Sequence, residues 1–164
     1  MKKDFYYTAS AIENSGLQRE KTNNVLWYLI KFDKPTMKTS KTVLTVDDDS
    51  SIRLLIRSAL QSLKTVKVIE AEDGLAGLEA VQKHQPDLVI LDVMMPNLDG
   101  IGALKELRSN PVTACMPVIM LTGVKDKSKL LPLLEQNSTD YLPKPFIIEM
   151  LRQKVASMLF PSAN

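Results

Sequence analysis

From about residue 42 onward, apolar and polar positions follow a regular block pattern. Short β-branched or aliphatic runs alternate with segments of helical spacing, and the segments stop at Gly, Pro or Asn. The predicted strands are Thr42–Val46, Val66–Ala71, Asp87–Val93, Pro117–Thr122 and Thr139–Leu142. The predicted helices cover residues 50–63, 74–84, 100–108, 126–136 and 146–159. This alternation indicates an α/β protein.

The third predicted strand is apolar on consecutive positions, since residues 88–91 are Leu, Val, Ile and Leu. Such a strand is buried on both faces, which indicates a parallel sheet covered by helices. In the first predicted helix an apolar stripe follows the i, i+3, i+4, i+7 spacing: Ile52, Leu55, Ile56, Ala59, Leu60 and Leu63. We expect this stripe to be buried, Arg53 to lie outside it, and Ser50 or Ser51 to cap the helix. The predicted fold is doubly wound α/β, a five-stranded parallel sheet flanked by helices in three layers.

Residues 1–40 break this rhythm. Only residues 25–30 are continuously apolar, and residues 34–36 (Lys-Pro-Thr) are typical of a linker. We therefore assign residues 1–40 to an N-terminal extension, a tail or linker of unknown role, and residues 41–164 to the folded domain.

Charge and composition narrow the function classes. The formal net charge is +2, which is too small to indicate binding to nucleic acid or to an anionic membrane. No apolar run reaches the ~18 residues that a membrane span needs. The single cysteine, Cys115, cannot form an internal disulfide, which suits a reducing compartment. We expect a cytoplasmic protein with no direct nucleic-acid contact and no membrane insertion.

Polar side chains gather where the predicted strands end. They are Asp47, Asp48 and Asp49 after the first strand, Asp92 at the third, Thr122 at the fourth and Lys144 after the fifth. Because the carboxyl ends of parallel strands share one edge of the sheet, these side chains should converge there. Any one of them alone is typical of a helix cap or a solvated charge. The combination on one edge indicates a site.

Clustered carboxylates raise one another's pKa unless a cation neutralises them. Mg²⁺ suits such a cluster, because it prefers oxygen ligands and keeps waters that a phosphate can replace. An aspartate in the cluster can act as a nucleophile towards phosphorus, with positive charge and a hydroxyl to stabilise the phosphoryl oxygens. The sequence therefore predicts aspartyl-phosphate chemistry.

Four segments carry a family resemblance: residues 42–49 (TVLTVDDD), 87–100 (DLVILDVMMPNLDG), 117–123 (PVIMLTG) and 140–146 (DYLPKPF). They resemble the receiver domains of two-component response regulators, in particular single-domain receivers of the chemotaxis-regulator kind. The resemblance spans about residues 41–160 and implies the flavodoxin-like form of the fold.

The resemblance implies a role for each acidic residue of the site. Asp92 would be the phosphoacceptor and a metal ligand. Asp48 would bind Mg²⁺ directly and Asp47 through water, and the backbone carbonyl of Met94 would complete the protein's share of the metal shell. Asp49 is interpreted as a helix cap instead.

The resemblance also implies a switch. Lys144 would pair with the phosphoryl oxygens, Thr122 would be the hydroxyl that moves to bond the new phosphate, and Tyr141 would be the aromatic that swings inward with it. His84, on a predicted helix among polar neighbours, is interpreted as a surface residue.

The function implied is a response regulator that receives a phosphoryl group on Asp92 from a sensor histidine kinase or a histidine phosphotransfer protein. It would catalyse only its own phosphorylation and dephosphorylation, so we do not expect an enzyme. Because the sequence ends at Asn164, directly after the last predicted helix, we expect a stand-alone receiver acting on a downstream protein target. A homodimer is left open, because Pro132 should kink the fourth predicted helix, on the face where receivers dimerise.

Three alternatives fit the sequence less well. An aspartate-nucleophile phosphatase would have a second Asp where this chain has Met94. A degenerate receiver that serves only as a binding module would not be expected to retain all of Asp47, Asp48, Asp92, Thr122 and Lys144. A flavin-binding protein of this fold would have a phosphate-cradling loop after the first strand, where acids stand here.

Two side chains predict a long-lived phosphorylated state. In the receiver domains that this sequence resembles, the side chains that position the attacking water stand two residues after the phosphoacceptor and two after the switch hydroxyl. Here they are Met94 and Val124, and neither can hold a water in line with the phosphorus. We expect slow self-dephosphorylation, and faster decay in Met94→Asn and Val124→Glu. The measurement is loss of phosphorylated protein after donor removal. Decay of both variants at the wild-type rate would show that these positions do not set the lifetime.

Overall fold

The computed structural model describes residues 40–123 and 138–161. The elements in chain order are β1 (Lys41–Val46), α2 (Ser50–Gln61), β2 (Val66–Ala71), α3 (Gly74–His84), β3 (Leu88–Asp92), α4 (Gly100–Ser109), β4 (Val118–Thr122), β5 (Thr139–Pro143) and α6 (Ile148–Leu159). All five predicted strands are present within one or two residues. The predicted helix at residues 126–136, with Pro132, and the extension up to residue 39 lie outside the described residues.

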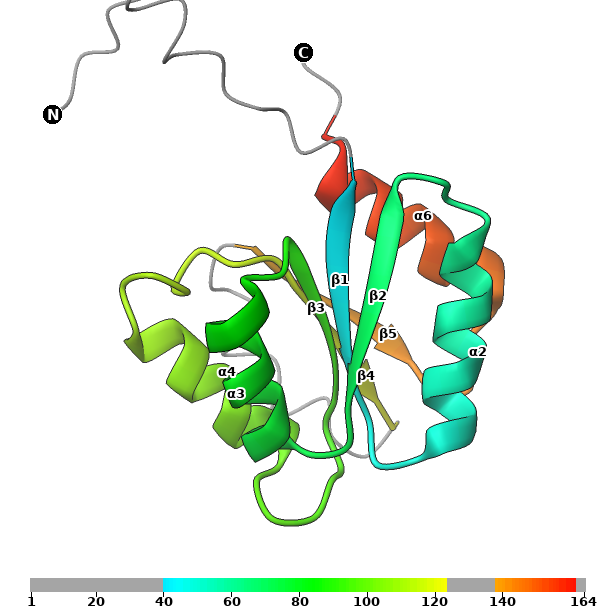
Figure 1. Ribbon diagram of the computed structural model, residues 1–164. Helices are drawn as coiled ribbons and strands as arrows, with labels where there is room; N and C mark the ends of the chain where they lie inside the picture. The colour runs from blue at the N-terminus through cyan, green and yellow to red at the C-terminus, as the bar shows by residue number, and fades with distance from the viewer. Residues whose placement is uncertain (1–39, 124–137, 162–164) are drawn as a thin grey trace, which may run out of the picture. The chain divides into compact units, whose positions relative to one another are not determined.

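The five strands form one parallel sheet in the order β2-β1-β3-β4-β5 (Figure 1). The chain steps outward from β1 to β2, then returns across β1 to continue with β3. The strand order therefore reverses between β1 and β3, and ligands of such sheets bind at the carboxyl ends of the strands beside this point. The predicted doubly wound fold is confirmed.

Helices cover both faces of the sheet. In Figure 1, α3 and α4 lie on one side of the strands and α2 and α6 on the other. Each face has its own hydrophobic core, and the central strands contribute alternate residues to the two: Leu91 packs in the core under α3 and α4, whereas Ile90 packs in the core under α2 and α6. Every residue of β3 and of β4 is buried, as the continuous apolar pattern predicts.

Helix α2 differs from its prediction in two respects. Leu55, expected in the buried stripe, is exposed, with 36% of its surface accessible. One residue step turns a helix by about 100°, so burying Ile56 against the sheet carries Leu55 to the edge of the stripe. The cap is Asp49, which confirms the interpretation of that residue as a helix cap and not the alternative of a serine cap: its carboxylate accepts a hydrogen bond from the Ser51 amide at 2.8 Å. The two serines are the first residues of the helix itself.

The remaining helix ends agree closely with their predictions, and α6 begins at Ile148 rather than at residue 146. None of the helices in the described part of the chain is long and apolar enough to cross a membrane.

One buried hydroxyl lacks a partner. Thr45 in β1 has no exposed surface, and no hydrogen-bond partner for its Oγ1 is found among the described residues. We expect Thr45→Val to raise the free energy of unfolding by about 1 kcal/mol, because it removes an unsatisfied polar group at nearly constant volume. Denaturant titration measures the change.

Thr113→Val is the matched control for this substitution. Thr113 is also buried, but its hydroxyl donates to the Leu107 carbonyl at 2.7 Å. The same substitution there should lower the free energy of unfolding by about 1 kcal/mol. A loss of stability in both variants would mean that the Thr45 hydroxyl is satisfied in solution.

Candidate functional site

The register of the sheet places the predicted site residues side by side. Val46 pairs with Leu91, so the next residues, Asp47 and Asp92, leave neighbouring strands together. The same stepwise relation continues across β4 and β5. Asp92 pairs with Leu121, the residue before Thr122, and Thr122 in turn pairs with Pro143, the residue before Lys144.

The turn between β1 and α2 folds so that one acid points inward. Asp47 is fully buried, whereas Asp48 and Asp49 are exposed. The Asp47 carboxylate accepts a hydrogen bond from the Asp49 amide at 3.0 Å. The Asp49 carboxylate turns to the helix instead, and its bond from the Ser51 amide lowers the pKa of Asp49. Asp47 therefore belongs to the buried site, whereas Asp49 caps the helix.

Lys144 joins two of the buried carboxylates. Its Nζ lies 2.8 Å from Oδ2 of Asp47 and 2.9 Å from Oδ1 of Asp92. Its backbone amide donates to the Thr122 carbonyl at 2.7 Å, which continues the ladder between β4 and β5 by one residue. One ammonium group therefore links the ends of the first, third and fifth strands.

Burial and charge shift the pKa values of Asp92 and Lys144. Burial raises the pKa of Asp92, and the nearby charge of Asp47 adds to that effect, while the bond and charge of Lys144 oppose it. Burial alone would lower the pKa of Lys144, but its bonds to Asp47 and Asp92 raise it above the ordinary value. The site thus holds its lysine charged and makes ionisation of Asp92 costly.

The carboxylates are close enough to share a cation. Asp47, Asp48 and Asp92 each offer a carboxylate oxygen, and these oxygens all lie within 4.8 Å of one another. Three oxygen donors facing one lysine leave an excess of negative charge, which a hard divalent cation would relieve. The donor set therefore fits Mg²⁺. Met94, whose carbonyl is the fourth predicted ligand, follows in the loop after β3 and is exposed at this edge.

The loop from β3 to α4 is held at two points that the sequence pattern did not reveal. Gly100 begins α4 directly against the end of β3, and its amide donates to the Val93 carbonyl at 3.0 Å. A Cβ there would collide with the Asp92 backbone carbonyl, so the position requires glycine. Further along, Asn97 takes a left-handed conformation and donates from its amide to Asp73, the cap of α3, at 2.6 Å. Asparagine tolerates this conformation, which is the one signal that the sequence offers.

The two switch residues occupy different environments. Thr122 has no exposed surface, and its hydroxyl donates to the Gly123 carbonyl at 2.8 Å. Tyr141 lies on the edge strand β5 and is 37% exposed, with no hydrogen bond from its hydroxyl to the acidic cluster in the described part of the chain. Val124 lies outside the described residues. The switch roles of Thr122 and Tyr141 stay predictions.

The family follows from this geometry together with sequence comparison. A family model described as "Response regulator receiver domain" matches residues 43–156. The chain belongs to this family. It is similar to the receiver domain of the Francisella response regulator 1452, with 31% identity, a TM-score of 0.67, and coverage of 76% of this chain and 100% of that one.

Two further relatives bear on the metal and on the output of this receiver domain. The receiver domain of the sensor histidine kinase PA1611 from Pseudomonas aeruginosa, solved with magnesium in its active-site cleft, is 26% identical with a TM-score of 0.65, covering 73% of this chain and 98% of that one. A protein named "Probable transcriptional regulator ycf27" from Cyanophora paradoxa is 40% identical over 124 residues, which are 76% of this chain and 50% of that protein.

These comparisons correct one expectation. We expected no direct contact with nucleic acid, but several relatives that share this domain are named transcriptional regulators. The chain spans about half the length of the curated relatives it matches. The net charge of a receiver domain describes only the surface of that domain. It carries no information about nucleic-acid contacts made through other domains. The argument from net charge was therefore wrong.

The raised pKa of Asp92 generates a prediction about stability. A carboxyl whose pKa is raised by folding binds its proton more tightly in the native state, so stability falls as pH rises from 3.8, its ordinary value, through the raised value. Asp92→Asn removes that loss, and Lys144 keeps its partner Asp47. We expect a higher Tm than wild type at neutral pH without metal, and no difference below pH 3.8. A lower Tm at neutral pH would mean that the ion pair outweighs the cost of burial.

Proposed function

We propose that this receiver domain is a phosphorylation-dependent switch whose phosphoacceptor is Asp92. The observation that carries the proposal is the bridge from Lys144 to Asp47 and Asp92, at 2.8 and 2.9 Å, beside three carboxylates that can share a cation. This arrangement sets a nucleophile, a fixed positive charge and a metal-binding group at one end of the sheet, which is what phosphoryl transfer to an aspartate requires.

The proposed donor is a phosphohistidine of a sensor histidine kinase or of a histidine phosphotransfer protein. A carboxylate oxygen of Asp92 attacks the phosphorus, an O–P bond forms, and the P–N bond to the donor imidazole breaks with its electron pair left on nitrogen. Lys144 stabilises the charge on the phosphoryl oxygens. Asp48, Asp92 and the Met94 carbonyl would hold Mg²⁺ directly and Asp47 would hold it through water, and the metal would supply further positive charge.

The new phosphoryl group is then a hydrogen-bond acceptor at the end of β3. In the unphosphorylated structure the Thr122 hydroxyl donates to the Gly123 carbonyl, and it can exchange this bond for one to the phosphate. Tyr141, exposed on β5, is the side chain that we propose moves with it. These movements of Thr122 and Tyr141 alter the surface around β4 and β5, and with it the affinity of the receiver for its target protein.

In this proposal the domain acts on no other substrate, so it is not an enzyme in the ordinary sense. We place it in the cytoplasm, in agreement with a chain that has one cysteine and cannot form an internal disulfide. The proposal concerns the receiver itself, and the output follows from whatever binds its phosphorylated form.

Intact mass before and after treatment with acetyl phosphate and Mg²⁺ tests the assignment. Wild type should gain one phosphoryl group and Asp92→Asn none, because the amide is not a nucleophile towards phosphorus. Asp49→Asn is the matched control: it removes a charge from the same turn but keeps the helix cap, since Asn caps as well as Asp. It should be phosphorylated like wild type. Phosphorylation of Asp92→Asn at the wild-type rate would place the phosphoacceptor elsewhere.

A further inference from the structure

We infer that Arg53 is a positioning residue for the metal-binding turn, and that it sets the affinity of the site for Mg²⁺ without touching the metal. This inference rests on the proposed function, because it concerns the same cluster of carboxylates. Arg53 lies on α2, one turn of helix after the acids, and was expected from the sequence to lie outside the buried stripe.

The guanidinium holds the backbone of two of the three acids that precede the helix, Asp47 and Asp48. Nη1 of Arg53 donates to the carbonyl of Asp47 at 2.7 Å and approaches the carbonyl of Asp48 at 3.3 Å. No donor to the Asp48 carboxylate is found in the described part of the chain, so the direction of that side chain depends on its backbone. Arg53 is the side chain that fixes this backbone from the helix.

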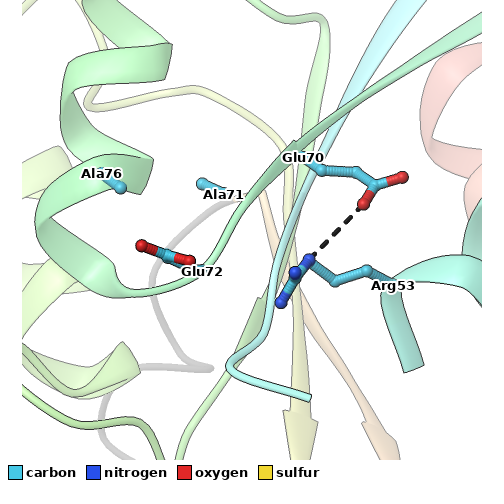
Figure 2. A pocket seen from close by; sticks show the side chains of 5 residues that line it. All are labelled: Arg53, Glu70, Ala71, Glu72 and Ala76. Atoms are coloured by element: carbon cyan, nitrogen blue, oxygen red, sulfur yellow. Dashed lines mark ion pairs between the residues drawn. The ribbon is translucent and has the colours of Figure 1, made fainter. Parts of the chain in front are cut away.

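The other side of the guanidinium is anchored on β2. Nε of Arg53 lies 3.4 Å from Oε2 of Glu70, and the Arg53 side chain is only 16% exposed. Figure 2 shows Arg53 reaching from α2 towards Glu70 at a cleft of about 310 Å³ that Glu72 also lines. The planar fork can thus bind a carboxylate with one edge and carbonyls with another, which a lysine cannot do.

Arg57, one turn further along α2, serves as a control that separates the effect of the hydrogen bonds to the turn from the effect of positive charge. It also pairs with Glu70, at 3.0 Å from Nη1 to Oε1, but no hydrogen bond from it to the turn is present among the described residues. Both arginines carry one positive charge and share one carboxylate. Of the two, Arg53 alone bonds to the turn among the described residues.

A positioning role and simple electrostatics predict changes of opposite sign in the Mg²⁺ dissociation constant when Arg53 is replaced by a neutral residue. Removing a positive charge near the acids would strengthen Mg²⁺ binding by Coulomb attraction alone. Releasing the turn would weaken it, because the carboxylates must then be ordered when the metal binds. The direction of the change in the dissociation constant therefore decides between the two.

The test is calorimetric titration of the full chain with MgCl₂, without phosphodonor, for wild type, Arg53→Met, Arg53→Lys and Arg57→Met. We expect the Mg²⁺ dissociation constant to rise about tenfold in Arg53→Met, as for other residues that orient metal ligands. Arg53→Lys keeps the charge but not the fork, so a smaller rise is expected. Arg57→Met should stay close to wild type.

Two further readouts distinguish positioning from general damage. Hydrogen exchange at the amides of residues 49 and 50 should quicken in Arg53→Met, while amides of β3 stay protected. Phosphorylation of Arg53→Met by acetyl phosphate should approach the wild-type rate at saturating Mg²⁺, because Asp92 and Lys144 are untouched.

Unchanged or tighter Mg²⁺ binding by Arg53→Met would overturn the inference, as would equal weakening in Arg57→Met. Should Arg53→Met fail to fold, Arg53→Lys decides: a dissociation constant equal to that of wild type would overturn the inference as well. Absence of Mg²⁺ binding by wild type would instead overturn the metal site of the proposed function.

Discussion

The bridge from Lys144 to Asp47 and Asp92 is the interaction that allows two acids to be buried together at the end of the sheet. Two carboxylates buried at the end of a sheet repel each other, and each loses the water that would stabilise its charge. A single ammonium group within 2.9 Å of both makes the arrangement tolerable. It does so from the residue directly after β5, a strand whose position relative to β1 is set by the intervening strands β3 and β4. The site therefore exists only when the sheet is complete.

Lys144 compensates only part of the negative charge of the site. Lys144 supplies one positive charge, whereas Asp47, Asp48 and Asp92 together can supply three negative ones. Burial keeps the pKa of Asp92 raised despite its lysine. The native state therefore carries an electrostatic cost that a bound cation would relieve, and a site of this kind has a physical reason to bind one.

Backbone geometry around the carboxylates is controlled from three directions. Arg53 holds the turn after β1 from the side of α2 and β2. Gly100 lets α4 begin against the end of β3, and Asn97 ties the same loop to Asp73 at the start of α3. None of these residues is an expected ligand. Together they determine how the backbone presents the acids, which is the part of a metal site that a list of ligands leaves out.

Local patterns in the sequence predicted the order of the described elements and the edge at which the acids gather. Apolar runs on consecutive residues and helical spacing are local signals, and the carboxyl ends of parallel strands share an edge by construction. Strand positions and the cluster of Asp47, Asp48 and Asp92 could therefore be predicted. The comparisons, rather than the structure, corrected the expectation about nucleic acid.

Features that depend on distant partners appear only after the helices and strands have packed. Leu55 fits the apolar stripe of its helix equally well on paper, but the orientation of α2 against the sheet leaves it exposed. Arg53 lies outside the apolar stripe of α2, and its ion pair with Glu70 on β2 appears only after helix and strand have packed. Lys144 was expected at the same edge as the acids, but its ion pair with Asp47, 97 positions away in sequence, appears only in the packed sheet. Periodicity reports which face of an element is apolar, whereas a contact between side chains far apart in sequence exists only after the elements have packed.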